Sequence, residues 1–574
     1  MRSGCPEACR LWVDGMDFLE PVFELLIPAL FYSSMAALMA VMLLKRREIA
    51  RTVGVAGIAL PALGMAAVFV VLAWTVPIHF PTYGDEFAYM DAAKSLAAKG
   101  RYVTCDYDSL EESCRLVDKP YQAYIMILAL AFRAFGATVE VAAMTNVILG
   151  AMAVVLVSLV SCQLFSKRSA SLMAAAMFAL FPVNLAMAKS AETAMASVLF
   201  IVLTLFLFLA WKRRQEPMML AAFMISLSLA VQARMENLLL IPLFVVGFAL
   251  FGKKRGFRRW LPWLAFFALI APHLMQVYAL ASGNAVAFTD SEGVLFSAGY
   301  MAQNALGAAY FLASTPQNAL LTALFLSCLL LRKGWKRGER GFMALLFIGF
   351  FAAMSAYAFA GFSRFCAMGV DPYDQNLRYL MPAFSVIAIV ASGGTEGFER
   401  FHGLRRHKNA CVWLLPLLML VLSSLAVSDL IQGKAPCGSS SVASYRGFLA
   451  MAPRIPANCM VMMMNSDLAT ALTELKGLDA EPALDHLERL KDALKGGVCV
   501  VYLETPMDRK WMTEARMKSR LKDGPKPYLG SEFAFRLLAN ESFCGEDFYV
   551  TLEEVTIRGA QAQWVAPGQA IHDV

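Results

Sequence analysis

Residues 79–100 read HFPTYGDEFAYMDAAKSLAAKG, and they begin where a long apolar block ends. The composition from Asp85 onward is helical, Tyr89 lies on its more apolar face, and Gly100 is a typical helix stop. Asp85 and the adjacent Glu86 occupy the expected first turn, where the helix dipole stabilises negative charge. The segment therefore predicts a helix that lies on a membrane surface with two carboxylates at its N-terminus.

Apolar blocks dominate the rest of the chain. Of its 574 residues, 59% are hydrophobic and only 17% are charged, whereas soluble domains are nearer to half apolar and a quarter charged. A helix needs about 20 residues to cross a bilayer, and about twelve blocks approach or exceed that length. They are residues 22–44, 53–78, 139–165, 170–188, 193–211, 218–233, 237–251, 260–280, 318–331, 341–361, 377–395 and 410–428. The sequence predicts a polytopic α-helical membrane protein.

The distribution of Lys and Arg predicts the orientation. Basic residues gather in alternate connectors, namely 45–51, 166–169, 211–217, 252–260, 332–340 and 396–409. The positive-inside rule places these connectors in the cytoplasm. Both termini and a long first loop, residues 79–138, then lie outside. Because these clusters account for the net charge of +7, nucleic acid is not an expected partner. A bacterial inner membrane with a periplasmic outer side fits best.

Three parts of the chain differ in composition. Residues 1–52 form an N-terminal extra transmembrane helix and a cytoplasmic connector, and residues 53–428 form the transmembrane core. Residues 429–574 are more polar, and in them the apolar runs 459–464 and 498–503 alternate with helical stretches, one of them near 507–521. Alternating strands and helices predict a parallel sheet. We expect a small α/β domain on the outer side.

Cysteine positions agree with this topology. Of the 12 cysteines, those outside the predicted spans all fall on the predicted outer side, and disulfides persist in oxidising compartments. Cys105 and Cys114 bracket one short segment and form the best disulfide candidate, with free thiols as the alternative. The connectivity of the C-terminal cysteines cannot be read from the sequence.

Several polar residues near the outer face have two interpretations. Asp85 and Glu86 suit a general base for a hydroxyl, but Asp is also a common helix cap. Lys119 can pair with a phosphate or extend to lipid headgroups. Glu192, at the outer edge between two spans, either faces a site or lies at the membrane edge, where a charge costs little. Arg234 and Glu236 can form an ion pair that holds a turn.

Metal ligands are weakly supported. The six His residues lack ligand spacing. The oxygens of Asp85, Glu86 and another outer carboxylate could hold a divalent cation, but we do not expect a metal, and no other cofactor is indicated.

The first loop resembles one known family. The Asp85-Glu86 pair after a span, Tyr89, the helix that ends at Gly100, and Lys119 before an apolar stretch resemble GT-C type integral-membrane glycosyltransferases. The protein-mannosyltransferase and aminoarabinose-transferase relatives are the most similar. Weaker similarities lie at 182–192, at Arg234 with Glu236, and at Arg378-Tyr379 with Pro382.

The resemblance implies a GT-C fold and a set of roles. Asp85 would be the catalytic base, and Glu86 would shape the acceptor site. Lys119 would contact the phosphate of a polyprenyl-phosphate sugar donor, and Arg378 and Tyr379 would help to bind that donor. Tyr89 and Glu192 would contribute to substrate binding. The acceptor would be a glycolipid, a polysaccharide or a protein, and transfer would invert the sugar.

Two departures from the family pattern and two alternatives stay open. A single proline, Pro120, follows Lys119 where relatives often have two, and two spans precede Asp85 where the family core has one. A multi-span transporter or lipid flippase is the main alternative, and a non-catalytic scaffold is the other. Transporters tend to place ionisable residues at mid-membrane in repeated halves, whereas the ionisable residues here cluster at the outer edge.

Overall fold

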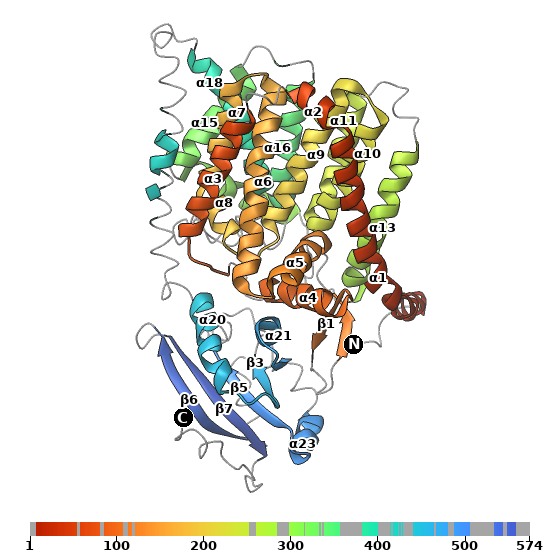
Figure 1. Ribbon diagram of the computed structural model, residues 1–574, viewed down its shortest axis with the longest axis vertical. Coiled ribbons are helices and arrows are strands. Elements are labelled where there is room, and N and C mark those ends of the chain that lie inside the picture. Colours follow the sequence, from red (N-terminus) through yellow and green to blue (C-terminus); the bar gives the residue numbers. More distant parts are fainter. Residues whose placement is uncertain are drawn as a thin grey trace. The chain divides into compact units, whose positions relative to one another are not determined.

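The computed structural model of the protein divides into two compact units (Figure 1). Unit 1 comprises Met1–Thr104 and Arg115–Gly433, and unit 2 comprises Cys105–Cys114 and Lys434–Val574. The structure describes residues 7–53, 58–80, 85–106, 113–117, 121–251, 260–283, 298–314, 316–331, 335, 338–355, 381–399, 414, 417–422, 424–425, 428, 440–463, 467–479, 487–505, 533–543 and 548–557.

Unit 1 is helical, and its long helices lie side by side while α4 and α5 lie across one end (Figure 1). The helices are α1 (Glu7–Leu44), α2 (Arg46–Val53), α3 (Ala59–Thr75), α4 (Asp85–Lys99), α5 (Gln122–Phe135), α6 (Val139–Phe165), α7 (Arg168–Ala179), α8 (Pro182–Ala188), α9 (Ala194–Arg214), α10 (Pro217–Ala233), the 3₁₀-helix η3 (Met235–Leu239), α11 (Leu240–Phe251), α13 (Trp260–Gly283), α14 (Ala298–Ser314), α15 (Pro316–Leu331), α16 (Glu339–Ser355) and α18 (Met381–Glu399).

Some of these helices are long and apolar enough to cross a membrane. Among the described residues, the segments that pass by length and composition are Val22–Leu44, Val139–Phe165 and Ala194–Arg214, with α7 and α8 as a bent fourth. Most of the other predicted spans appear as shorter apolar helices, such as α3 and α10. The count of about twelve spans therefore stays a prediction. Helix α14 lies in the predicted outer connector 281–317, where the sequence did not indicate a helix.

The predicted helix at the start of the first loop is confirmed. Helix α4 begins at Asp85, and Gly100, with φ +71°, donates its N–H to Leu96 O at 3.0 Å as the helix ends. Phe87 and Tyr89, on opposite faces of α4, are both buried. Protein therefore covers α4 on several faces, and its position at the membrane surface stays a prediction.

A break divides the predicted span 170–188. Helices α7 and α8 meet at a bend of 59°. Polar side chains hydrogen-bond backbone carbonyls at the bend: Asn184 Nδ2 donates to Phe178 O at 2.9 Å, and Gln317 Nε2 of α15 donates to Leu180 O at 2.9 Å. Backbone that leaves helical geometry at membrane depth must find partners within the protein. These amides supply such partners.

Unit 2 contains a mixed five-stranded sheet. The strands are β3 (Cys459–Met463), β4 (Lys476–Asp479), β5 (Cys499–Glu504), β6 (Phe533–Phe543) and β7 (Phe548–Ile557), in the order β4-β3-β5-β7-β6. Helices α20 (Ser440–Met451), α21 (Asp467–Leu472) and α23 (Leu487–Lys495) and the 3₁₀-helix η7 (Ala452–Arg454) accompany them. β3 and β5 are parallel, as predicted. β4, which pairs parallel with β3, and the antiparallel hairpin of β6 and β7 are strands that the sequence did not indicate, so the sheet is mixed and not purely parallel. The predicted helix near 507–521 lies outside the described residues.

One side of the sheet carries a compact apolar core. Met460 and Met462 of β3 and Val500 and Tyr502 of β5 alternate along their strands and share a buried cluster. The residues between them, such as Val461 and Val501, are also fully buried, so β3 and β5 are covered on both faces, as is usual for parallel strands. The core explains why these short apolar runs form strands.

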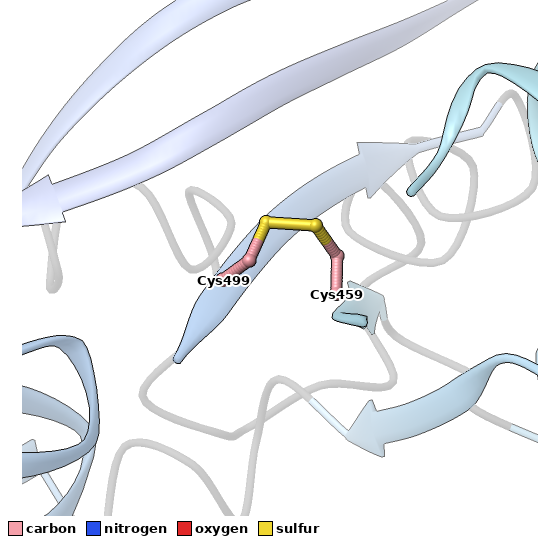
Figure 2. The surroundings of a disulfide bond; sticks show 2 residues. All are labelled: Cys459 and Cys499. Atoms are coloured by element: carbon pink, nitrogen blue, oxygen red, sulfur yellow. A yellow bond between two sulfur atoms is a disulfide. The ribbon is translucent and has the colours of Figure 1, made fainter. Parts of the chain in front are cut away.

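A disulfide joins the first residues of two adjacent parallel strands. Cys459 of β3 is the register partner of Cys499 of β5, and their Cα atoms are 4.4 Å apart (Figure 2). A second, two-stranded sheet pairs β1 (Val103–Asp106) with β2 (Ser113–Leu116). Cys114 of β2 is also disulfide-bonded, and its pairing with Cys105 stays a prediction.

Candidate active site

The first turn of α4 carries two carboxylates in different environments. Asp85 is partly exposed, whereas Glu86 is fully buried. The backbone that precedes them adjoins the loop after α8, because His79 N–H donates to Lys189 O at 3.4 Å. Two segments more than a hundred residues apart in sequence therefore meet beside the N-terminus of α4.

Aromatic rings join α4 to α5. The Tyr89 ring packs edge-on against Tyr121, with centroids 5.3 Å apart, and against Tyr124, with centroids 6.1 Å apart. The Arg234 guanidinium lies 5.8 Å from the centre of the Tyr121 ring and pairs with Glu236 through Nη2–Oε1 at 3.2 Å. The ion pair considered from the sequence is thus present, and it lies beside the tyrosines.

Tyr124 lies close to two carboxylates. Burial raises the pKa of its hydroxyl well above the ordinary value, and the negative charges of Glu192 and Glu86 raise this pKa further. Tyr124 therefore remains a neutral hydroxyl that can donate or accept a hydrogen bond. Its two acidic neighbours come from separate elements, Glu86 from α4 and Glu192 from the loop before α9.

Asn146 of α6 links Tyr124 to the loop that carries Glu192. Its Nδ2 donates to the carbonyls of Ser190 and Glu192 at 2.7 Å each and lies 3.4 Å from the Tyr124 hydroxyl. Asn146 is fully buried and Glu192 is 1% exposed. One Glu192 oxygen, Oε2, accepts the Thr193 hydroxyl at 3.0 Å. The arrangement fixes both the backbone and the side chain of Glu192.

The structure brings some predicted site residues together and leaves others undescribed. Glu86, Tyr89 and Glu192 meet around Tyr124, and Asp85 is the immediate neighbour of Glu86. The predicted donor-binding residues Lys119, Arg378 and Tyr379 lie outside the described residues.

Tyr124 and Asn146 are site residues that the sequence analysis missed. Asn146 is a polar residue inside an apolar block of 27 residues, α6, and polar side chains within such blocks are often functional. That signal was present in the sequence. The link from α6 to the loop before α9 joins residues 46 positions apart, and spacing does not reveal it.

The described residues do not form a metal site. Within them, no group of three or more His, Cys, Asp and Glu is arranged to hold a metal ion. Asp85, Glu86 and Glu192 are carboxylates, which suit hydroxyl chemistry as readily as cation binding.

The arrangement can be compared with known proteins. The model of the family described as dolichyl-phosphate-mannose-protein mannosyltransferase matches residues 118–276, from the segment before α5 into α13. A comparison with curated proteins gives no match.

Two solved structures are similar over most of the chain. Both are crystal structures of ArnT from Cupriavidus metallidurans, one bound to undecaprenyl phosphate and one in the apo state. The first has a TM-score of 0.53 at 13% identity and covers 87% of this chain and 98% of ArnT. The second has a TM-score of 0.55 at 12% identity and covers 85% of this chain and 97% of ArnT. The family match, these structures and the apolar helices together show that the chain is an integral membrane protein with the fold of GT-C type glycosyltransferases, as the sequence resemblance predicted.

Proposed function

We propose that this protein is a membrane glycosyltransferase that moves a sugar from a polyprenyl-phosphate carrier to a hydroxyl acceptor. The observation that carries the proposal is the convergence of Glu86, Glu192 and the neutral Tyr124 next to Asp85, at one end of a GT-C fold. Acidic side chains held near a hydroxyl-binding position suit general-base chemistry on an alcohol.

Asp85 is the proposed catalytic base. It is partly exposed at the N-terminus of α4, where the helix dipole favours its ionised form. In the proposed reaction, the acceptor oxygen attacks the anomeric carbon and its proton passes to Asp85. The bond from the anomeric carbon to the phosphate oxygen breaks, and the polyprenyl phosphate leaves with the electron pair. Attack from the opposite face inverts the sugar.

Glu86 and Glu192 act beside the base in this proposal. Both are buried near Tyr124, so the Tyr124 hydroxyl and the two carboxylates form a polar wall that can accept hydrogen bonds from sugar hydroxyls. Tyr89 holds Tyr124 by its ring contact. Lys119, Arg378 and Tyr379 are the proposed donor-binding residues, with Lys119 at the phosphate.

The donor class and the location belong to the same proposal. The ArnT structure that resembles this chain is bound to undecaprenyl phosphate, which supports a polyprenyl-phosphate donor. We place the protein in a bacterial inner membrane with the site on the periplasmic side, as the distribution of Lys and Arg indicates. A glycolipid, a polysaccharide and a protein are the candidate acceptors.

The test is sugar transfer from radiolabelled polyprenyl-phosphate donors by membranes that contain the wild type or Asp85→Asn. Asn caps a helix about as well as Asp, so the variant should fold. Loss of a general base should lower kcat by about 100-fold to 10,000-fold. Donor binding, measured by isotope retention on the purified protein, should not change.

Glu140→Gln is the matched control. Glu140 is an exposed carboxylate in the first turn of α6, and its neutralisation should leave kcat within about twofold of the wild type. Equal transfer by the wild type and Asp85→Asn would remove Asp85 as the base. If labelled donor instead accumulated on the opposite side of sealed vesicles, without transfer to any acceptor, the protein would be a transporter and not a glycosyltransferase.

A further inference from the structure

Asn146 makes contacts that bear on the proposed reaction without touching its reacting atoms. Both amide hydrogens of its Nδ2 are used by the two carbonyls at 2.7 Å, Ser190 O and Glu192 O. The opposite amide orientation would place Oδ1 against two carbonyl oxygens, which is repulsive, so this orientation is fixed by chemistry. Within the described part of the chain Oδ1 has no hydrogen-bond partner. The contact is made through the donor side of the amide.

The loop held by this amide has further internal bonds. The Ser190 hydroxyl donates to Met187 O at 2.9 Å and accepts from Glu192 N at 3.3 Å. Thr193 then donates from its hydroxyl to Glu192 Oε2 at 3.0 Å. The chain from 190 to 193 is thus tied to α8 and to its own side chains, and Asn146 alone among these contacts ties it to α6.

We propose that Asn146 is a positioning residue that holds the 190–192 backbone on α6, so that the Glu192 carboxylate faces Tyr124 and Glu86. The inference rests on the proposed glycosyl transfer for its kinetic consequence and on the hydrogen bonds alone for its structural one. A buried carbonyl that loses its hydrogen-bond donor destabilises the conformation that buries it. Removal of the Asn146 amide should therefore allow the 190–192 backbone to shift away from α6.

The kinetic test is a double-mutant cycle between Asn146→Ala and Glu192→Gln. Glu192→Gln should lower kcat by about 100-fold, and Asn146→Ala should lower it by about tenfold, because small displacements of a positioned group are costly. Since Asn146 acts through Glu192, the double variant should be within about twofold of Glu192→Gln alone. Because Glu192 contacts sugar hydroxyls in the proposed function, any rise in the KM for the donor in Asn146→Ala should likewise be absent when Glu192→Gln is already present. The proposal would be overturned if the fold-losses of kcat in the two single variants multiplied in the double variant. It would also be overturned if Asn146→Ala kept the wild-type kcat.

Asn237→Ala is the matched control. Asn237 is also buried and also donates two hydrogen bonds from Nδ2, to Ala230 O at 2.7 Å and to Ser197 Oγ at 2.9 Å. It should cost similar stability, but its effect on kcat should multiply with that of Glu192→Gln. Ser190→Ala is a milder second variant in case Asn146→Ala does not fold. Ser190→Ala should lower kcat less than Asn146→Ala does, and it should cause no further loss when Glu192→Gln is already present.

Amide hydrogen exchange separates failure of this inference from failure of the proposed function. Exchange at residues 190–194 of the purified full-length protein should become at least about tenfold faster in Asn146→Ala, because local opening governs exchange. Asn237→Ala should not accelerate exchange there. Unchanged exchange in Asn146→Ala would overturn the inference whether or not the wild type transfers sugar. Absence of transfer by the wild type, with faster exchange, would count against the proposed function alone.

Discussion

The two ends of the helical unit use charged residues differently. At the end that carries α2, cations meet carboxylates: Lys45 pairs with Glu48 at 3.3 Å and with Glu216, and Lys212 pairs with Glu339 at 2.6 Å. At the end that carries α4, opposite in Figure 1, Glu86 and Glu192 lie near a neutral hydroxyl. The first arrangement stabilises helix contacts. The second concentrates negative potential where we propose that a substrate hydroxyl binds.

The pairs at the α2 end join helices that are distant in sequence. Lys45 lies at the junction of α1 and α2, Glu216 precedes α10, and Arg214, at the end of α9, lies 3.6 Å from Glu48. The ammonium of Lys212 also lies 4.1 Å from the centre of the Phe251 ring. The basic residues of these connectors therefore hold helices together, and loss of a charge at the two ends should have different consequences.

The largest expected effect is at the α4 end. Glu86→Gln keeps the size of the side chain and removes its negative charge, so it should lower kcat by about 100-fold with little change in folding. Initial rates of sugar transfer measure this effect. Glu216→Gln, at the α2 end, should leave kcat within about twofold of the wild type, because the Lys45–Glu216 pair lies at the end of the helical unit opposite to α4. Similar losses in both variants would remove the distinction between the two ends.

A smaller effect, on stability rather than turnover, should follow from Lys212→Met. The Glu339 side chain is only 8% exposed, so removal of its ammonium partner should lower the free energy of unfolding by about 2 kcal/mol. Thermal unfolding in detergent measures the loss, and kcat at low temperature should remain near the wild-type value. Lys212→Met combined with Glu339→Gln should recover most of the stability, since no buried charge is then left without its partner. A double variant less stable than Lys212→Met would show that the two losses are independent.

The smallest effect concerns pH at the α2 end. The hydrogen bond from Lys45 lowers the pKa of Glu48 below its ordinary 4.5. A lowered folded-state pKa contributes stability that is present above the unfolded value and is lost as the pH falls through the folded one. Below pH 4.5 the melting temperature of the wild type should therefore fall slightly more steeply than that of Glu48→Gln. Parallel curves would show that the Lys45–Glu48 contact contributes nothing.

Local signals predicted α4 well. The stop at Gly100 and the acidic first turn placed α4 within a residue of its observed bounds, because capping and glycine conformation are properties of a few adjacent residues. Helix α14 was missed because its sequence, with Gly299, Gln303 and Asn304, is less apolar than a typical span. Asn304 is nevertheless buried and donates to Ser355 O of α16 at 3.0 Å. Tertiary contacts of this kind override local composition.

The candidate site was predicted only in part, for the same reason. Asp85 and Glu86 stood out because they are adjacent and follow a span. Tyr124 and Asn146 lie inside apolar stretches, and their importance comes from contacts between α5, α6 and the loop before α9. Burial on all sides of α4 was equally hidden, because one sequence does not show which neighbours cover a helix.

The bend between α7 and α8 has a consequence for synthesis of the protein. The Leu180 carbonyl at the bend accepts its hydrogen bond from Gln317, which lies 137 residues later in the chain. Ribosomes add about 5–20 residues per second, so roughly ten seconds separate the two residues during translation. Throughout that interval the bend lacks this partner. Formation of this hydrogen bond is therefore a late step in assembly, and a chain truncated before α15 would contain α7 and α8 without the Gln317 contact at their junction.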